Sequence, residues 1–205
     1  MTEQEKMLLG KLYKTNDPTL AAAYQRAGIL SKKYNDTFVN EQAKRVKILK
    51  ELLPHLGKNS VLRGPIWFDY GKNTYIGDNC YANYNFTVLD CAHIKIGDDV
   101  FFGPNCTLAP PVHPLLSDER KMKTDADGSL YDMEYAKPIT IQDGCWLASN
   151  VTVCGGVTIG KNSVIGAGSV VTRDIPENVF AAGNPCKIIR QLTEQDSVQY
   201  KKELF

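Results

Sequence analysis

The sequence predicts a mainly β protein: a parallel β-helix of hexapeptide repeats that follows a small helical segment and opens into one long excursion loop. Aliphatic side chains recur at every sixth position from Ile141 to Val171. Helical spacing of apolar residues is confined to residues 1–57. Between Ala109 and Ile139, about 30 residues lack the six-residue repeat, which is too long for an ordinary connection. These three observations define the predicted architecture.

Composition excludes several classes of protein. The chain has 205 residues, with 24 Lys and Arg against 23 Asp and Glu and a formal net charge of +1. That balance argues against a nucleic-acid-binding protein, which needs a clustered basic excess. The first residues, Met1–Lys6, are charged and lack the apolar core of a secretion signal. No apolar run approaches the ~18 residues that a membrane span needs, so we expect a cytoplasmic protein without a membrane or nucleic-acid partner.

The N-terminal residues 1–57 are predicted to be helical. Helix starts are indicated at three places: a capping box at Thr2–Glu5, an acidic cap before proline at Asp17-Pro18, and a third possible cap at Asn40. Apolar residues follow each start at helical spacing. Such a short segment has apolar faces that must pack against the rest of the chain.

Six consecutive hexads carry the β-helix prediction. Their first positions are aliphatic: Ile141, Leu147, Val153, Ile159, Ile165 and Val171. Their fifth positions are small or β-branched: Cys145, Val151, Val157, Ser163, Ser169 and Ile175. The same phase runs from Ile76 to Ile94, gains two residues, and continues from Ile96 to Leu108. Three hexads form one triangular coil, whose aliphatic side chains point into the prism, and stacked coils supply their own core.

The six cysteines do not form a recognisable metal or disulfide pattern. Cys80, Cys106 and Cys145 fall at the fifth hexad position, where a small apolar side chain fits. Cys91, Cys154 and Cys186 have no base nearby in the sequence. The spacings lack C-x-x-C and zinc-site patterns. We therefore expect reduced, mostly buried thiols and no cysteine nucleophile.

Three histidines are candidates for proton transfer near neutral pH. His55 lies beside Pro54 and is expected at the surface, and His93 lies at a corner of the β-helix. His113 stands where the repeat opens into the long loop, which makes it the strongest candidate. No two histidines are spaced as in the zinc sites of β-helical carbonic anhydrases, so no metal is predicted.

The chain resembles the maltose/galactoside O-acetyltransferase family of hexapeptide-repeat acyltransferases over essentially its full length. The resemblance is carried by His113-Pro114 and by five further segments: residues 10–18 (GKLYKTNDP), 68–73 (FDYGKN), 76–90 (IGDNCYANYNFTVLD), 165–176 (IGAGSVVTRDIP) and 182–190 (AGNPCKIIR). The hexads alone indicate only an acyltransferase-like β-helix. The helical segment together with Ala82-Asn83-Tyr84-Asn85 and His113-Pro114 is much more specific.

The resemblance implies a left-handed β-helix that assembles as a homotrimer, with acetyl-CoA bound between adjacent subunits. His113 matches the general base of the family, which takes the proton of an acceptor hydroxyl. Asn83 matches an active-site residue that holds the acceptor and the histidine in line. Direct transfer of the acetyl group needs no protein nucleophile. The backbone around Ser149 matches the group that faces the developing oxyanion.

Further residues match binding positions of the family. Asp17, Asp69 and Asp90 match, or nearly match, positions that bind the acceptor, although Asp17 also fits a helix cap and Asp90 a turn. The positions that match acetyl-CoA contacts are Ser149, Ala167, Thr172, Arg173, Lys187 and Arg190, whose cations suit the phosphates of CoA. Trp146 could pack along the pantetheine arm or fill the trimer interface. The loop after His113 is longer than in typical members of the family, with about Met122–Met133 as extra sequence. The identity of the acceptor is therefore the family property that can least be carried over to this chain.

We therefore expect an acetyl-CoA-dependent O-acetyltransferase that acts on a sugar or glycoside hydroxyl. The expected organisation is a helical acceptor-side segment (residues 1–57), a β-helix (58–190) with its excursion loop (110–138), and a tail (191–205). One alternative is a hexapeptide acetyltransferase with a serine or antibiotic hydroxyl as acceptor. Another is a non-catalytic trimeric binding module, although the cations near the expected CoA groove favour an enzyme.

Overall fold

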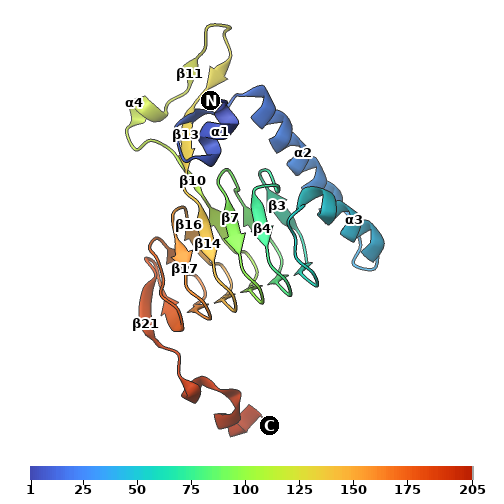
Figure 1. Cartoon of the computed structure of the whole chain (residues 1–205), viewed down its shortest axis with the longest axis vertical. Coiled ribbons are helices and arrows are strands. Elements are labelled where there is room, and N and C mark those ends of the chain that lie inside the picture. The colour runs from blue at the N-terminus through green and yellow to red at the C-terminus, as the bar shows by residue number, and fades with distance from the viewer. Residues whose placement is uncertain (205) are drawn as a thin grey trace.

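The structure is a computed structural model that describes residues 1–204. The N-terminal segment contains helices α1 (Glu3–Leu8), α2 (Pro18–Asn35) and α3 (Gln42–Leu52) and a short strand, β1 (Tyr13–Lys14). The two longer helices lie across one end of a stack of coils, and α1 and β1 lie beside the excursion loop (Figure 1).

Two of the three predicted helix starts are confirmed. Thr2 and Glu5 form the reciprocal capping box of α1. The Asp17 carboxylate accepts hydrogen bonds from two backbone N–H groups in the first turn of α2. The prediction for Asn40 is wrong: α3 begins after Glu41, and among its described contacts none comes from a capping side chain.

Three parallel sheets form the body of the molecule. Sheet I contains β4 (Thr74–Ile76), β7 (Ile94–Ile96), β14 (Ile139–Ile141) and β17 (Thr158–Ile159). Sheet II contains β2 (Val61–Leu62), β5 (Tyr81–Ala82), β8 (Phe101–Phe102), β15 (Trp146–Leu147), β18 (Val164–Ile165) and β20 (Val179–Ala182). Sheet III contains β3 (Ile66–Phe68), β6 (Phe86–Val88), β9 (Thr107–Ala109), β16 (Thr152–Cys154) and β19 (Val170–Val171). The chain visits sheets II, III and I in turn, which confirms the predicted left-handed parallel β-helix.

The hexad positions occupy the interior, as predicted. The six first-position side chains from Ile141 to Val171 are each at most 1% exposed. Cys80, Cys106 and Cys145 are buried at the fifth position. Burial of each aliphatic side chain contributes about 1.5–3 kcal/mol, so the stacked coils hold one another together.

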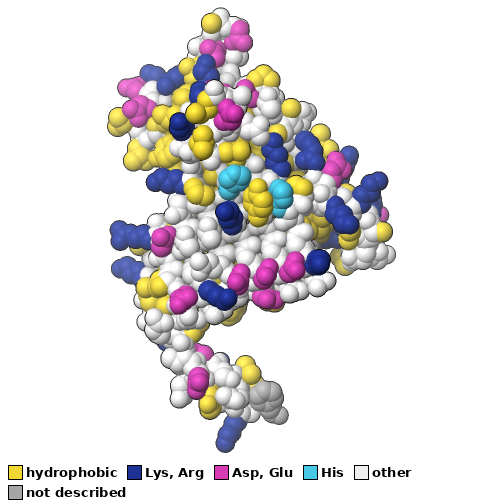
Figure 2. Space-filling view, viewed as in Figure 1, with side chains coloured by type: hydrophobic (Ala, Val, Ile, Leu, Met, Phe, Trp, Pro, Cys, Tyr) yellow, Lys and Arg dark blue, Asp and Glu magenta, His cyan; other side chains and the backbone are white. Residues whose placement is uncertain are grey.

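Asparagine residues shape the corners of the coils. Asn105 and Asn150 adopt left-handed backbone conformations with φ of 61° and 60°, which asparagine tolerates better than most residues. Their amides also stack: Asn85 Nδ2 donates to Asn105 Oδ1 at 2.9 Å, and Asn105 Nδ2 donates to Asn150 Oδ1 at 2.9 Å. Acidic side chains form a second row along one edge of the β-helix (Figure 2). Side-chain ladders therefore fix the corners from one coil to the next.

The corner between sheets III and I is longer than the other corners. Ile76 pairs with Ile96, 20 residues further on, whereas Ile141 pairs with Ile159, only 18 further on. The two-residue gain read from the hexads is present, but it lies at this corner, before Ile94, and not between Ile94 and Ile96 as predicted. In the next coil the same corner opens into the excursion loop.

The excursion loop has its own secondary structure. It contains β10 (Pro111–Val112), α4 (Ser117–Arg120), β11 (Lys123–Thr124), β12 (Leu130–Tyr131) and β13 (Met133–Ala136). β13 is the central strand of an antiparallel sheet with the order β1-β13-β10. Hydrophobic side chains gather around this region and the N-terminal helices (Figure 2). The loop and the N-terminal strand therefore fold together as one layer.

Helices α2 and α3 cap the first coil. The carbonyl groups at the end of a parallel β-helix have no further coil to bind. The Arg45 guanidinium donates to the carbonyls of Leu62 and Arg63, at 3.2 and 2.8 Å, and Asn35 Nδ2 donates to that of Ile66 at 2.9 Å. These side chains satisfy backbone acceptors that would otherwise lie buried and unpaired.

The C-terminal part begins with β21 (Lys187–Gln191), which pairs antiparallel with β20 at the edge of sheet II. Three short 3₁₀ helices follow: η1 (Glu194–Asp196), η2 (Val198–Tyr200) and η3 (Lys202–Leu204). This tail extends away from the body (Figure 1). Among residues 1–204, no helix has the length and apolar character needed to cross a bilayer.

Candidate active site

His113 directly follows β10 and lies opposite β13. The register pairs Val112 with Tyr135, so His113 comes opposite Glu134 in the next row. His113 Nε2 lies 3.5 Å from Glu134 Oε2, and its Nδ1 lies 3.5 Å from Asp132 Oδ2. The imidazole is 44% exposed, whereas both carboxylates are largely covered. The histidine is thus accessible to a substrate and has a carboxylate near each ring nitrogen.

Asp132 and Glu134 are not among the candidate residues of the sequence analysis. They alternate along the strand that returns from the excursion loop, and alternate side chains of a strand share a face. Only the pairing of β13 with both β10 and β1 brings them to His113. Alternation in a strand-like segment was the available signal, but the register could not be read from one chain.

A cavity of about 330 Å³ lies between the N-terminal segment and the enlarged corner. His113 is not part of its lining, but Glu134, which lies 3.5 Å from His113 Nε2, is. Its polar lining includes Asp69, Glu134 and Thr15, and its aromatic lining includes Tyr24 and Tyr70, whose rings meet edge to face at 6.4 Å. Aromatic faces with convergent carboxylates suit a small polyhydroxylated molecule. The cavity is therefore the candidate acceptor site.

Asp69 is the one predicted acceptor residue that lines this cavity. Burial, together with the charges of Asp90 and Glu134, raises the pKa of Asp69 to about 7. The carboxyl thus changes charge near neutral pH. Asp17 lies at the nearby start of α2, where its Oδ1 is already occupied as a helix cap.

The structure overturns the prediction that Asp90 binds the acceptor. Its side chain is fully buried, and its carboxylate accepts hydrogen bonds from the backbone N–H groups of Tyr70, Gly71 and Asn73 and from the Thr74 hydroxyl. Burial raises the pKa of Asp90, and these hydrogen bonds oppose that rise. Asp90 holds the enlarged corner of the first coil, and no face of it is open to a ligand.

Asn83, Ser149 and Ala167 share a different corner. Each follows a strand of sheet II, at the turn toward sheet III. The coils lie close there: a side chain at Gly103 would come within 2.6 Å of the Ser149 backbone nitrogen, and Gly168 N donates to Ser149 O at 2.9 Å. Within residues 1–204, no hydrogen bond or ion pair joins this corner to His113, whose ion-pair partners are Asp132 and Glu134. One copy therefore does not bring Asn83 and His113 together.

The remaining predicted acetyl-CoA residues are exposed. Thr172 and Arg173 follow β19, at the same corner as the excursion loop. Trp146, on the outer face of sheet II, is 52% exposed, and Lys187 lies on β21. The Arg190 guanidinium is engaged, because its two terminal nitrogens donate to both oxygens of Asp196 at 2.8 and 2.6 Å.

The cysteines and the other histidines lie outside this chemistry. All six cysteines are free, and burial raises the pKa of Cys91, beside Glu134, well above its usual range. His55 and His93 flank Tyr75 on sheet I, with ring centroids 4.3 and 5.8 Å from it. In the part of the chain that the structure describes, no three acidic, histidine or cysteine side chains are grouped to hold a metal.

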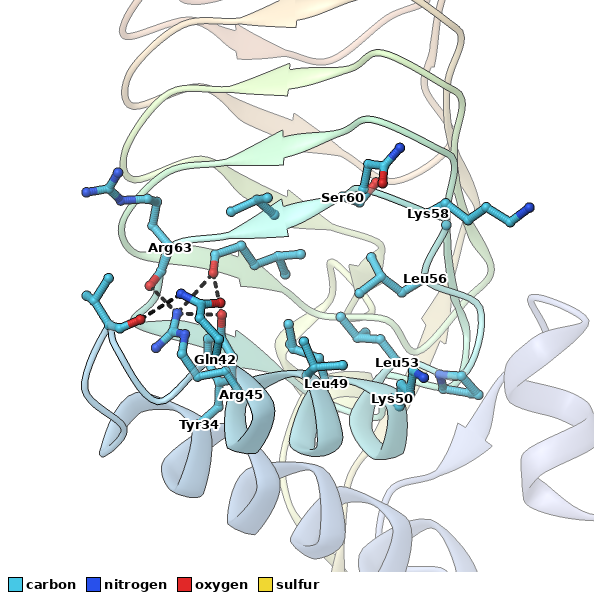
Figure 3. A pocket seen from close by; sticks show the side chains of 17 residues that line it. Tyr34, Gln42, Arg45, Leu49, Lys50, Leu53, Leu56, Lys58, Ser60 and Arg63 are labelled. Atoms are coloured by element: carbon cyan, nitrogen blue, oxygen red, sulfur yellow. Dashed lines mark hydrogen bonds between the residues drawn. The ribbon is translucent and has the colours of Figure 1, made fainter.

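A larger cavity of about 870 Å³ lies between α3 and the first coil (Figure 3). Leucines line its middle, and basic side chains such as Lys50, Lys58 and Arg63 lie at its ends. Its described lining contains no carboxylate, histidine or cysteine. The smaller cavity, which is lined by Asp69 and Glu134, is therefore the better candidate for chemistry that involves proton transfer.

Known proteins are similar to this chain in sequence and in architecture. The maltose acetyltransferase hexapeptide capping motif matches residues 6–57, the hexapeptide repeat of succinyl-transferase matches 93–113, and the six-repeat bacterial transferase hexapeptide matches 138–173. The galactoside O-acetyltransferase of Escherichia coli K12 is 40% identical over 203 residues, which cover 99% of this chain and 96% of that protein.

Two solved structures superpose on most of the chain. A galactoside acetyltransferase in complex with coenzyme A has a TM-score of 0.88 at 40% identity and covers 96% of this chain and 94% of its own. A maltose O-acetyltransferase from Clostridium difficile 630 has a TM-score of 0.86 at 41% identity, with coverage of 95% and 99%.

Proposed function

Because the chain belongs to the maltose/galactoside O-acetyltransferase family of hexapeptide-repeat acyltransferases, we propose that it transfers the acetyl group of acetyl-CoA to a hydroxyl of a sugar or glycoside. The observation that carries this proposal is that Glu134 contacts His113 and also lines a cavity whose other lining includes Asp69 and two aromatic rings. The relative that binds coenzyme A supports the donor, and the relatives named for galactosides and maltose support the acceptor.

His113 is the proposed general base. The acceptor hydroxyl gives its proton to the imidazole while its oxygen bonds to the carbonyl carbon of the thioester. The carbon–sulfur bond then breaks, and the CoA thiolate leaves and takes the proton back from the imidazolium. General-base catalysis of this kind contributes about 10²- to 10⁴-fold. Asp69 and Asp17 are the proposed acceptor ligands.

Acetyl-CoA is proposed to bind along the corners and the C-terminal edge of the β-helix. Exposed Arg173 and Lys187 suit its phosphates, and Thr172 and Ala167 are proposed to contact it. The backbone near Ser149 is proposed to face the developing oxyanion, with Asn83 aligning the acceptor. Arg190 would join this set only after release from Asp196.

A homotrimer is proposed because two sets of site residues lie on different corners of one prism. A neighbouring copy could place the Asn83 corner against the His113 corner. An exposed apolar column on sheet II supports such packing: Val61, Phe101 and Trp146 are 51%, 49% and 52% exposed. Val61 pairs with Tyr81, Tyr81 with Phe101, and Phe101 with Trp146 in successive strands, so the column is continuous. The six free cysteines support a location in the reducing cytoplasm.

The test is release of CoA thiol from acetyl-CoA with a panel of acceptors: galactosides, maltose, serine and chloramphenicol. We expect turnover with the glycosides and a loss of about 10²-fold or more in His113→Ala. His55→Ala is the matched control, because His55 lies exposed and away from the cavity. Equal turnover in both variants would contradict the assignment of the base. Turnover with serine or chloramphenicol, and none with the glycosides, would overturn the proposed acceptor. A protein that binds no CoA in calorimetry would favour the non-catalytic binding module.

A further inference from the structure

Three side chains form one row across the antiparallel sheet beside the cavity. The register pairs Tyr13 of β1 with Glu134 of β13, and Glu134 in turn lies opposite His113 after β10. The Tyr13 hydroxyl donates a hydrogen bond to Glu134 Oε1, while Glu134 Oε2 lies 3.5 Å from His113 Nε2. The N-terminal strand thus reaches the histidine through one carboxylate.

A second row repeats the arrangement. Thr15 follows β1 and lies opposite Asp132, with its backbone N–H donating to Asp132 O at 3.3 Å. The Thr15 hydroxyl donates to Asp132 Oδ1, and Asp132 Oδ2 lies 3.5 Å from His113 Nδ1. Each carboxylate therefore has one oxygen bound to β1 and the other facing the imidazole.

The two carboxylates differ in their relation to the cavity. Glu134 lines it together with Tyr13 and Thr15, whereas Asp132 is not part of its lining. A base needs one nitrogen open to the acceptor and the other held as an N–H donor. Nε2 lies on the side of Glu134, the carboxylate that lines the cavity, and Nδ1–H is the group that Asp132 can hold.

We propose that Tyr13 and Thr15 are positioning residues of the reaction, which fix Glu134 and Asp132 on the two nitrogens of His113. This inference rests on the proposed role of His113 as base. Asp132 holds Nδ1–H and leaves the Nε2 lone pair free for the acceptor proton. The imidazolium that forms then offers its new N–H to Glu134.

The protonation of Tyr13 agrees with its part as a donor. Burial, followed by the neighbouring Glu134, raises the pKa of Tyr13 far above its ordinary value, so the phenol keeps its proton. Tyr13 is also 2% exposed, within a small cluster of buried residues that includes Met7 and Tyr70. The phenol is held firmly enough to fix the carboxylate.

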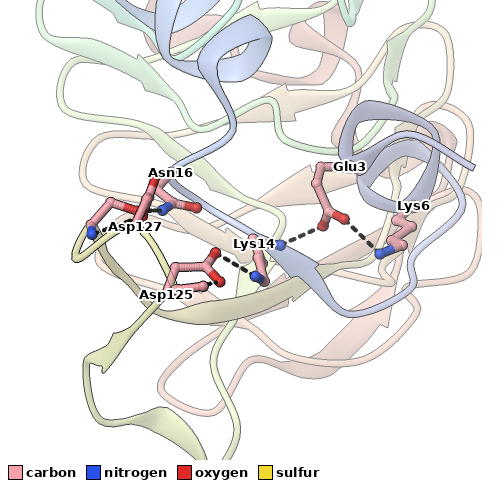
Figure 4. Close-up of polar contacts among 8 residues, drawn as sticks. Glu3, Lys6, Lys14, Asn16, Asp125 and Asp127 are labelled. Atoms are coloured by element: carbon pink, nitrogen blue, oxygen red, sulfur yellow. Dashed lines mark hydrogen bonds and ion pairs between the residues drawn. The ribbon is translucent and has the colours of Figure 1, made fainter.

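Lys14, between these two residues, offers a matched control. Its side chain leaves the other face of the strand, where Nζ lies 2.5 Å from Asp125 Oδ2 and 4.4 Å from the Tyr131 ring centroid (Figure 4). Lys14→Gln therefore removes the ion pair between β1 and the excursion loop and leaves the carboxylates beside His113 unchanged.

The kinetic test compares Tyr13→Phe, Thr15→Val and Thr15→Ser with Lys14→Gln. Tyr13→Phe and Thr15→Val should each lower kcat about ten- to hundredfold, as expected for a lost hydrogen bond to a charged group, and leave KM for acetyl-CoA within about twofold. Thr15→Ser keeps the hydroxyl and should keep most of the activity. Equal loss in Thr15→Val and Thr15→Ser, or no more loss than in Lys14→Gln, would overturn the proposal.

A second readout does not depend on turnover. Proton titration of ¹³C-labelled histidine by NMR should show the His113 midpoint at lower pH in Thr15→Val, because Asp132 no longer stays on Nδ1. The His55 signal serves as an internal reference, and Lys14→Gln should leave both midpoints in place. An unmoved His113 midpoint in Thr15→Val refutes the positioning role. A moved midpoint in a protein that acetylates no acceptor would instead refute the proposed function alone.

Discussion

Asp69 makes stability depend on pH in a direction that can be worked out from the structure. Its carboxyl lines the candidate acceptor cavity, and burial beside Asp90 and Glu134 raises its pKa to about 7. In the unfolded chain an aspartate titrates near about 3.9. Between these two values the folded protein holds a proton that the unfolded chain has already released.

The sign of the effect follows from this proton. Stability falls as pH rises wherever the folded state binds more protons than the unfolded state. Each unit of pKa difference corresponds to about 1.4 kcal/mol, so a difference of about three units costs at most about 4 kcal/mol. The cost is absent near pH 4, grows through pH 5 and 6, and is complete above about pH 7.

Asp69→Asn removes the titrating group and keeps the shape of the side chain. The variant should match the wild type at pH 4 and exceed its free energy of unfolding by up to about 4 kcal/mol at pH 8. For a chain of this length, that gain raises the unfolding temperature by about 10 °C. Circular dichroism melts at pH 4 to 8, at one fixed protein concentration, measure the difference.

Asp118→Asn is the control, because the Asp118 side chain is 90% exposed and does not line the cavity. Its melting temperature should follow that of the wild type at every pH. If the gap between wild type and Asp69→Asn is the same at pH 4 and pH 8, the reasoning is refuted. The same variant reports on function: KM for the acceptor should fall as wild-type Asp69 ionises above pH 7, and should stay flat with pH in Asp69→Asn.

The other predictions concern single residues elsewhere in the molecule. Asp90→Ala leaves three backbone N–H groups and a hydroxyl without an acceptor, so urea unfolding should show a loss of about 3–5 kcal/mol; a loss below about 1 kcal/mol would contradict its structural role. Phe101→Lys places a charge in the apolar column of sheet II and should shift the sedimenting species to the monomer, whereas Lys95→Ala on sheet I should not. Asp196→Asn releases Arg190 and should lower KM for acetyl-CoA about threefold at low salt; an unchanged KM would remove Arg190 from the binding set.

The β-helix could be predicted from the sequence because its core residues follow a short-range repeat. One aliphatic residue in six, from Ile141 to Val171, specifies an interior position whatever the rest of the chain does. The capping box at Thr2 and the cap at Asp17 were readable for the same reason, since each motif acts within one helical turn. Asn40 failed because a capping residue type alone does not decide where a helix begins.

The site was harder to predict because it depends on pairing between distant segments. His113 stood out by its place at the break in the repeat, but its carboxylate neighbours required the register of β13 against two strands. Asp90 was misassigned because an aspartate in a turn looks alike whether it faces a ligand or backbone N–H groups. Burial, which separates the two cases, is a property of the folded chain.

The two ends of the excursion loop leave the β-helix side by side. Lys137 N donates to Pro110 O at 3.1 Å, so the chain departs and returns across a single hydrogen bond. The coils above and below resume their pairing, with Ile139 aligned to Ile94. The loop is therefore inserted between two aligned rungs, so its length can change without shifting the scaffold, provided that His113, Asp132 and Glu134, which lie within it, keep their places.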